Sequence, residues 1–255
     1  SRFKREVEVC RRGKGPQVAE LVDAGPDDLQ PWLAIRYVPG PTLREAITNH
    51  GPLVGATLRG FALAVAEALR QIHLCGVVHR DLKPSNIILT PATPVIIDFG
   101  IAAVSEGTSL TATGTALGSA GWMAPEQVLG RPSGTPADVF SWAAVVAYAA
   151  TGRPPFGDGR PEALAYRIVH EDADLDGISG DLRTLLERAL RRDPADRPSL
   201  ADLLAILNGD TEATLVAAGI ARTGLPRVWL TSLTRGAASR EGCSDAQEVP
   251  TRVQA

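Results

Sequence analysis

The segment of residues 77–102, VVHRDLKPSNIILTPATPVIIDFGIA, places polar and charged side chains between short apolar runs. Asp81, Lys83, Asn86 and Asp98 are residue types that suit phosphoryl transfer, a reaction that needs a positioned hydroxyl and neutralised phosphate charge rather than covalent help. A carboxylate at Asp81 would orient the attacking hydroxyl and accept its proton. Lys83, two residues later, would bring a positive point charge to the phosphate.

A magnesium site fits the same segment. Magnesium prefers hard oxygen ligands and keeps several waters, so one or two protein oxygens per ion suffice. The carboxylate of Asp98 and the amide oxygen of Asn86 would supply them. Each residue taken alone has a simpler interpretation, because Asp81 and Asn86 would more often be turn or capping residues and Lys83 a solvated surface group. Their joint arrangement favours a catalytic site.

Three motifs occur in a specific order along the chain. They are His79-Arg80-Asp81 with Asn86 after four intervening residues, Asp98-Phe99-Gly100 after an apolar run, and Ala124-Pro125-Glu126. In this order and spacing they resemble the catalytic elements of bacterial serine/threonine protein kinases of the eukaryotic-like type. The resemblance covers roughly residues 2–207.

The resemblance implies an α+β, protein-kinase-like fold with a mostly-β upper lobe and a helical lower lobe. It also implies a serine/threonine protein kinase that transfers the ATP γ-phosphate to protein hydroxyls, with Mg²⁺, or Mn²⁺ as the alternative ion, as cofactor. The implied partners are Ser/Thr-containing protein substrates and a second copy of the kinase, in a dimer for trans-autophosphorylation.

The resemblance assigns roles to individual residues of the catalytic region. Asp81 is the base, Lys83 contacts the phosphate, and Lys83-Pro84-Ser85 is typical of the Ser/Thr-specific branch. Ser119, in a segment that resembles the substrate-docking loop, would bond to Asp81 and Lys83. His79 is expected to be structural and to brace the loop.

Residues 104–117 are rich in serine and threonine. Composition alone favours a flexible loop there. The resemblance favours an activation loop with Thr111 and Thr113 as phosphorylation sites. A phosphate on either residue would add negative charge that an arginine binds well, and Arg80 is the natural partner.

Three further residues are expected to be architectural. Glu126 and Arg197 match an ion pair that the kinase family buries in the lower lobe. Asp138, at the start of an apolar helix, resembles the residue that tethers the catalytic loop, although an aspartate there could instead cap the helix.

The N-terminal part departs from the kinase pattern. A Gly-rich loop G-x-G-x-x-G and a strand lysine, the elements that hold ATP, are both absent. RFKREVEV aligns best with the following helix, which makes Glu6 the residue that pairs with the missing lysine and Glu8 the second choice; a solvated helix face is the alternative for Glu6. Ile35, Tyr37 and Val38 would form the hinge that binds adenine.

These departures suggest a kinase domain at 1–207 that lacks its first strands. Residues 1–38 would be the remainder of the upper lobe, 39–207 the lower lobe, and 208–255 a partly disordered tail. The second hypothesis for function is an inactive fragment or pseudokinase that acts as a binding or regulatory module. The intact catalytic motifs favour the enzyme.

The elements that must position the site follow from hydrophobic periodicity. Strands are expected at ELVDAG, PWLAIRYV, NIILT and PVIID. Thr42 and Glu45 form a plausible capping box for a short helix that ends near Gly51. Further helices are expected at 57–73, 136–150, 161–170, 181–191 and 199–207.

Composition limits the location and the partners. The net charge of −3 gives no indication of nucleic acid as a partner. The three cysteines, Cys10, Cys75 and Cys243, are widely spaced, which suggests neither a disulfide framework nor a zinc site and fits a cytoplasmic protein. No apolar run reaches the ~18 residues at which a membrane span becomes plausible.

Overall fold

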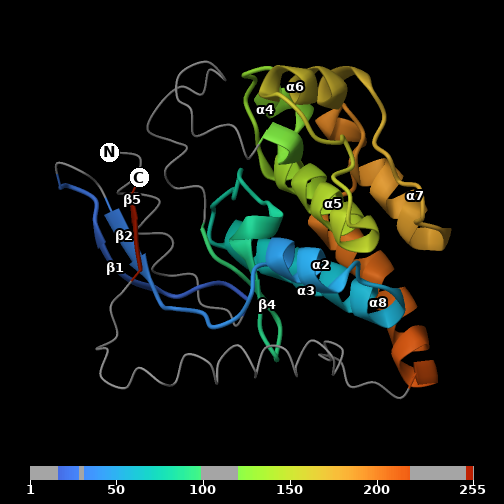
Figure 1. The fold of residues 1–255 in the computed structure, drawn as a ribbon, viewed down its shortest axis with the longest axis horizontal. Helices are drawn as coiled ribbons and strands as arrows, with labels where there is room; N and C mark the ends of the chain where they lie inside the picture. Colours follow the sequence, from blue (N-terminus) through green and yellow to red (C-terminus); the bar gives the residue numbers. More distant parts are fainter. Residues whose placement is uncertain (1–16, 29–31, 99–119, 219–250, 255) are drawn as a thin grey trace.

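The computed structural model describes residues 17–28, 32–98, 120–218 and 251–254. A small sheet lies on one side and a helical body on the other, with a short β-hairpin beside the helices (Figure 1). The arrangement matches the division into a β-containing part and a helical part that the sequence predicts. No helix among the described residues has the length and apolar character to cross a bilayer.

The small sheet has the order β1-β2-β5. Strands β1 (Leu21–Gly25) and β2 (Trp32–Ile35) lie within two of the predicted strand segments, and they pair antiparallel. The indole N–H of Trp32 donates to the Asp28 carboxylate at 2.6 Å, which ties the start of β2 to the connection from β1. Strand β5 (Thr251–Gln254) pairs with the other edge of β2, a pairing that the sequence did not predict.

A β-hairpin follows the predicted catalytic residues directly. The 3₁₀ turn η1 (Pro84–Asn86) leads into β3 (Ile87–Leu89), which pairs antiparallel with β4 (Pro94–Ile96). The chain that enters β1 also lies along β4, because Ile96 accepts from the Ala19 amide and donates to the Gln17 carbonyl, both at 2.9 Å. The hairpin therefore connects the catalytic loop with the chain that leads to the small sheet.

Two helices begin the helical body. Helix α2 (Leu43–His50) starts with the predicted capping box, which is confirmed because Glu45 N–H donates to the Thr42 hydroxyl and Thr42 N–H donates to the Glu45 carboxylate. Helix α3 (Gly55–Leu74) is close to the predicted range, and its buried apolar residues recur at helical spacing. Its buried face packs against α5 (Thr135–Thr151) and α8 (Leu200–Ala218).

Helix α5 (Thr135–Thr151) is the centre of the core. Every residue from Ala137 to Ala149 is buried, so the helix is surrounded on all sides and not amphipathic. The indole N–H of Trp142 donates to the Ala62 carbonyl of α3 at 2.9 Å. The helix ends at Gly152, which has φ 73° in the left-handed region that glycine adopts without strain.

The remaining helices pack against α5, against one another or against α3. They are α4 (Pro125–Val128), α6 (Pro161–His170), α7 (Gly180–Ala189) and α8 (Leu200–Ala218), with the 3₁₀ turns η4 (Ala120–Trp122) and η5 (Pro194–Asp196). Helix α8 continues well beyond residue 207, where the apolar pattern predicted its end.

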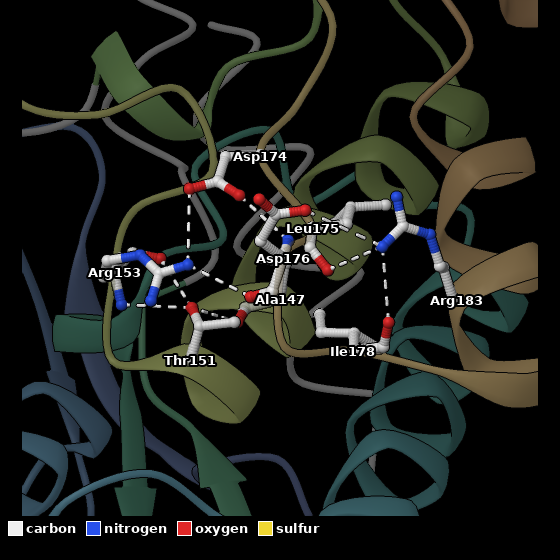
Figure 2. A network of polar contacts seen from close by, with 8 residues as sticks. All are labelled: Ala147, Thr151, Arg153, Asp174, Leu175, Asp176, Ile178 and Arg183. Carbon is white, nitrogen blue, oxygen red and sulfur yellow. Dashed lines mark hydrogen bonds and ion pairs between the residues drawn. The ribbon is translucent and has the colours of Figure 1, made fainter.

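A polar network fixes the connections around the end of α5 (Figure 2). The guanidinium of Arg153 donates to the Asp174 carboxylate at 3.3 Å and to the Asp176 carbonyl at 3.0 Å. Arg183 of α7 donates to the carbonyls of Leu175 and Ile178. These contacts hold the segment between α6 and α7 against the turn that follows α5.

Candidate active site

The structure brings three of the predicted catalytic residues together. Lys83 Nζ donates to Asp81 Oδ2 at 2.5 Å. Asn86 Nδ2 donates to the Asp81 carbonyl at 3.0 Å and lies 3.5 Å from Asp81 Oδ2. The side chains of Asp81 and Lys83 are partly buried, with 22% and 20% exposed. A carboxylate with an ammonium group and an amide beside it is therefore accessible from solvent at the start of η1.

The backbone before Asp81 has an uncommon conformation. Arg80 has φ 66°, which places a non-glycine residue in the left-handed region. This conformation costs roughly 1–2 kcal/mol for an L-residue, so neighbouring groups must hold it. Asp81 N–H donates back to the His79 carbonyl at 2.9 Å, which closes a tight turn around Arg80.

Asp138 holds this turn from the helical body. Its side chain is fully buried, and its two oxygens accept from the backbone amides of His79 and Arg80, each at 2.8 Å. His73 Nε2 lies 2.6 Å from Asp138 Oδ2. The N-cap of α5 is Gly134, so the carboxylate of Asp138 serves the loop amides rather than the start of its own helix.

Sequence reasoning missed two polar residues of this region. His73 lies in the last turn of α3, and its contact with Asp138 spans 65 positions. Gln127 of α4 donates from Nε2 to the Arg80 carbonyl at 2.8 Å. Neither contact has a local sequence signal, because each depends on how helices far apart in the chain pack beside the loop.

The two predicted metal ligands lie on neighbouring segments. The Ile97 amide donates to the Asn86 carbonyl at 2.9 Å, so the chain that carries Asp98 runs beside Asn86. The Asn86 amide group donates its N–H to Asp81, while its oxygen, among the described residues, receives only a 3.4 Å contact from the Ser85 hydroxyl. Asp98 has φ 101°, a second non-glycine residue with positive φ.

These donors fit a divalent cation that keeps water and substrate oxygens as ligands. Carboxylate and amide oxygens are hard ligands of the kind that magnesium prefers. Among residues 17–28, 32–98 and 120–209, no group of three or more His, Cys, Asp and Glu side chains could hold a metal ion. A cation at Asn86 and Asp98 would therefore take its other ligands from water, from substrate or from outside the described residues.

Glu126 and Arg197, predicted to form an ion pair, are in direct contact. Arg197 Nη1 and Nη2 donate to the two carboxylate oxygens of Glu126 at 2.8 and 2.7 Å. Both residues are buried. The bidentate geometry fixes the position of α4, the helix whose Gln127 side chain donates to the Arg80 carbonyl.

The Arg80 side chain contains a buried nitrogen atom. Its Nε is buried and has no hydrogen-bond partner within the part of the chain that the structure describes. A buried donor of this kind carries a desolvation cost unless a partner arrives. The predicted partners, phosphates on Thr111 or Thr113, lie outside the described residues, as do Ser119 and Glu6.

The predicted hinge follows β2. Ile35 ends this strand and is buried, and Val38 packs against the edge of the core. The Tyr37 side chain is 63% exposed. Arg36 N–H donates to the Glu20 carbonyl at 2.8 Å. The predicted hinge residues thus lie where the backbone passes from the small sheet to the helical body.

Comparison with known proteins agrees with the motifs. The family model described as protein kinase domain matches residues 1–206. A probable serine/threonine-protein kinase, PkwA of Thermomonospora curvata, is 45% identical over 210 residues, which are 82% of this chain and 28% of that protein. The serine/threonine-protein kinase AfsK of Streptomyces coelicolor is 42% identical over 230 residues, 90% of this chain and 28% of that protein.

A third relative is more distant. The serine/threonine-protein kinase PknB of Mycobacterium tuberculosis is 33% identical over 242 residues, which cover 88% of this chain and 39% of that protein. The chain therefore spans between about a quarter and two fifths of the length of these relatives, 28% to 39%.

Proposed function

The chain belongs to the protein kinase family, and from this premise we propose that the protein transfers the γ-phosphoryl group of ATP to serine and threonine hydroxyls of proteins. The observation that carries the proposal is the placement of Lys83 and Asn86 on Asp81, within 2.5 and 3.0 Å. The relatives are named as serine/threonine kinases, which supports the same substrate class.

In the proposed reaction the substrate hydroxyl oxygen forms a bond to the γ-phosphorus, and the bond from that phosphorus to the ADP oxygen breaks. The hydroxyl proton passes to the Asp81 carboxylate. The Asn86 N–H that donates to the Asp81 carbonyl fixes the loop, and the Lys83 ammonium lies where it would meet the transferring phosphate.

Kinases of this family use ATP with a divalent cation, and we propose Asn86 and Asp98 as its ligands, with Mg²⁺ as the ion and Mn²⁺ as the alternative. When bound, the cation neutralises phosphate charge. The backbone of Ile35, Tyr37 and Val38 is proposed to bind adenine, and Glu6 is proposed as a further residue of the nucleotide site. Ser119 is proposed to hold the substrate side of the site.

Regulation is proposed to act through the segment of residues 104–117. A phosphate on Thr111 or Thr113 would supply anionic oxygens to the Arg80 guanidinium, whose Nε is buried without a described partner. The phosphate would be added by a second copy of the kinase in a dimer. The substrates in this proposal are proteins, including the kinase itself.

The test is phosphate incorporation from Mg-ATP into casein and into the protein itself. We expect Asp81→Asn to lower the rate by roughly 100-fold or more, because it removes the proton acceptor. The matched control is Asp158→Asn, at an exposed position of the helical body. Equal rates for the protein and its Asp81→Asn variant would contradict the proposal.

The same experiment tests the regulatory part. Phosphate sites are mapped by mass spectrometry after the active protein is mixed with the Asp81→Asn variant carrying a different affinity tag. We expect Thr111 or Thr113 of the inactive copy to be modified. Phosphate found only outside residues 104–117, or only on the active copy, would contradict phosphorylation between copies.

A further inference from the structure

Gln127 in α4 bridges two separate segments with one side chain. Its Nε2 donates to the Arg80 carbonyl at 2.8 Å, and its Oε1 accepts from the Ala124 amide at 3.0 Å. Both ends of the amide are therefore used on backbone groups. We propose that Gln127 is a positioning residue for Asp81, an inference that rests on the proposed function.

The Arg80 residue is held by hydrogen bonds at both its backbone N–H and its backbone C=O. Its N–H donates to Asp138 Oδ1, and its C=O accepts from Gln127 Nε2, each at 2.8 Å. Arg80 is thus held on both sides while its φ is 66°. A non-glycine residue in this region returns to extended or right-handed conformations when nothing holds it.

The Arg80 carbonyl lies in the peptide bond that leads directly to Asp81, the proposed base. The carbonyl that Gln127 binds belongs to the peptide unit whose N–H is that of Asp81. Rotation of this peptide plane would turn the Cα–Cβ direction of Asp81 and with it the carboxylate that Lys83 contacts. Gln127 therefore acts on Asp81 through the Arg80 peptide, without touching the carboxylate.

The two hydrogen bonds restrict which side chain can stand at position 127. Only a neutral side chain with a donor at one end and an acceptor at the other can serve Arg80 and Ala124 together. Glutamate keeps the acceptor for the Ala124 amide and presents an oxygen to the Arg80 carbonyl. Methionine has nearly the same length and lacks both functions.

The two substitutions distinguish a role of Gln127 in holding the Arg80 carbonyl from a role limited to the start of α4. If Gln127 only satisfied the Ala124 amide at the start of α4, Gln127→Glu would behave like the unmodified protein. If it holds the Arg80 carbonyl, Gln127→Glu would be at least as harmful as Gln127→Met, because two oxygens would then face each other.

The first readout does not depend on activity. Hydrogen–deuterium exchange is measured for peptides that cover residues 77–86 in the unmodified protein and in Gln127→Met, Gln127→Glu and Gln71→Met. Gln71 is the matched control, since it lies in α3 and, among the described residues, its side-chain amide contacts only Glu67, at 3.4 Å. We expect faster exchange in both Gln127 variants and unchanged exchange in Gln71→Met.

The second readout is the kinetic constants for Mg-ATP and casein. We expect kcat to fall about tenfold in Gln127→Met and Gln127→Glu, because a displaced base is poorly aligned, with KM for ATP changed by less than about twofold. If Gln127→Met and Gln127→Glu both lower the melting temperature and leave kcat unchanged, Gln127 has only a structural role and the inference is overturned.

A double-mutant cycle identifies the mechanism. Asparagine tolerates positive φ better than arginine, so Arg80→Asn lowers the need for a group that holds the turn. We expect Gln127→Met to reduce kcat by less than about threefold when Arg80 is already asparagine, although Arg80→Asn lowers activity by itself. An undiminished tenfold loss in that background would overturn the inference.

The outcomes are separable from those of the proposed function. If the unmodified protein transfers no phosphate, the proposed function fails and the exchange comparison alone decides whether Gln127 positions the Asp81 loop. If the protein is active and exchange at residues 77–86 is the same in all variants, the positioning role is overturned and the kinase assignment stands.

Discussion

At the scale of single residues, the buried carboxylate of Asp138 has three polar contacts beside the candidate site. A buried carboxylate is costly unless hydrogen bonds compensate for the lost water. Here the amides of His79 and Arg80 donate to it, and His73 approaches it at 2.6 Å. The compensation and the function coincide, because the same bonds fix the turn that presents Asp81.

Replacing Asp138 with asparagine should therefore affect stability and catalysis together. The amide keeps one acceptor oxygen and turns the other position into a donor, so one loop amide or His73 loses its acceptor. We expect a loss of about 1–3 kcal/mol in the free energy of unfolding, the cost of an unsatisfied buried group. Urea denaturation measures it.

Phosphoryl transfer by Asp138→Asn should also fall, because the Arg80 turn loses one of its restraints. Asp158→Asn is the control, since it makes the same chemical change at an exposed site. If the Asp138→Asn variant had the stability and the rate of that control, the tethering role would be refuted.

At the scale of elements, Arg197 joins several segments of the helical body. Besides the two bonds to Glu126 of α4, it donates to the carbonyls of Pro136, Arg191 and Arg192. Its guanidinium carbon also lies 5.1 Å from the centre of the Phe140 ring. One side chain thus connects α4, the first turn of α5 and the segment before η5.

Removing this arginine should destabilise the protein far more than removing a surface arginine. Arg197→Met leaves the Glu126 carboxylate buried without its cation, and we expect a loss of about 3–5 kcal/mol in the free energy of unfolding. Arg192→Met removes an ion pair with Asp172, whose side chain is 95% exposed, and should cost about 0–1 kcal/mol.

Chemical denaturation of the two variants under identical conditions makes this comparison. A difference of less than about 1 kcal/mol between Arg197→Met and Arg192→Met would show that the buried pair contributes no more than a surface pair. Such a result would remove the argument that α4, and with it Gln127, is held by the pair.

At the scale of the whole molecule, the α+β, protein-kinase-like fold was predictable from local patterns and motifs. Helix α3 and helix α5 follow from runs of apolar residues, and the capping box at Thr42 follows from two residues three positions apart. The pairing of β5 with β2 was not predictable, because residues 251–254 and 32–35 are distant in the chain and strand pairing has no local signal.

Some residues of the candidate site were likewise predictable from the sequence, and others were not. Asp81, Lys83 and Asn86 lie within six consecutive positions, so the sequence itself brings them together. The resemblance supplied Asp138, which no spacing rule connects with Arg80. His73 and Gln127 were missed, because their partners are 65 and 47 positions away and their identity is decided by helix packing.

Acid stability is also a property of the whole molecule, because separate carboxylates contribute to it. A hydrogen bond from Arg70, with its charge, keeps the pKa of Glu67 below its ordinary value. Hydrogen bonds from the Ser199 hydroxyl and amide lower the pKa of Asp202. For Asp174, the largest cause of the lowered pKa is the hydrogen bond from the Asp176 amide, and the Arg153 charge adds to it (Figure 2).

The direction of these shifts fixes the pH dependence. A carboxylate with a lower pKa in the folded state favours folding above its unfolded pKa, about 3.9 for Asp and 4.3 for Glu. That contribution is lost as the pH falls through the folded-state pKa, because both states are then protonated. We therefore expect the melting temperature to be nearly constant from pH 7 to 5 and to fall below about pH 4.

Asp174→Asn tests this expectation at one carboxylate. The asparagine oxygen still accepts from the Asp176 amide, which now lies 2.9 Å from Asp174 Oδ1, so the variant removes the titration and keeps the hydrogen bond. We expect a shallower decrease in melting temperature between pH 4 and 2.5 than in the unmodified protein, measured by circular dichroism. Asp158→Asn, at an exposed position on the same side of the helical body, is the control. Equal acid slopes for Asp174→Asn and the unmodified protein would mean that the bond from Asp176 persists when Asp174 is protonated, and the linkage between its titration and folding would be absent.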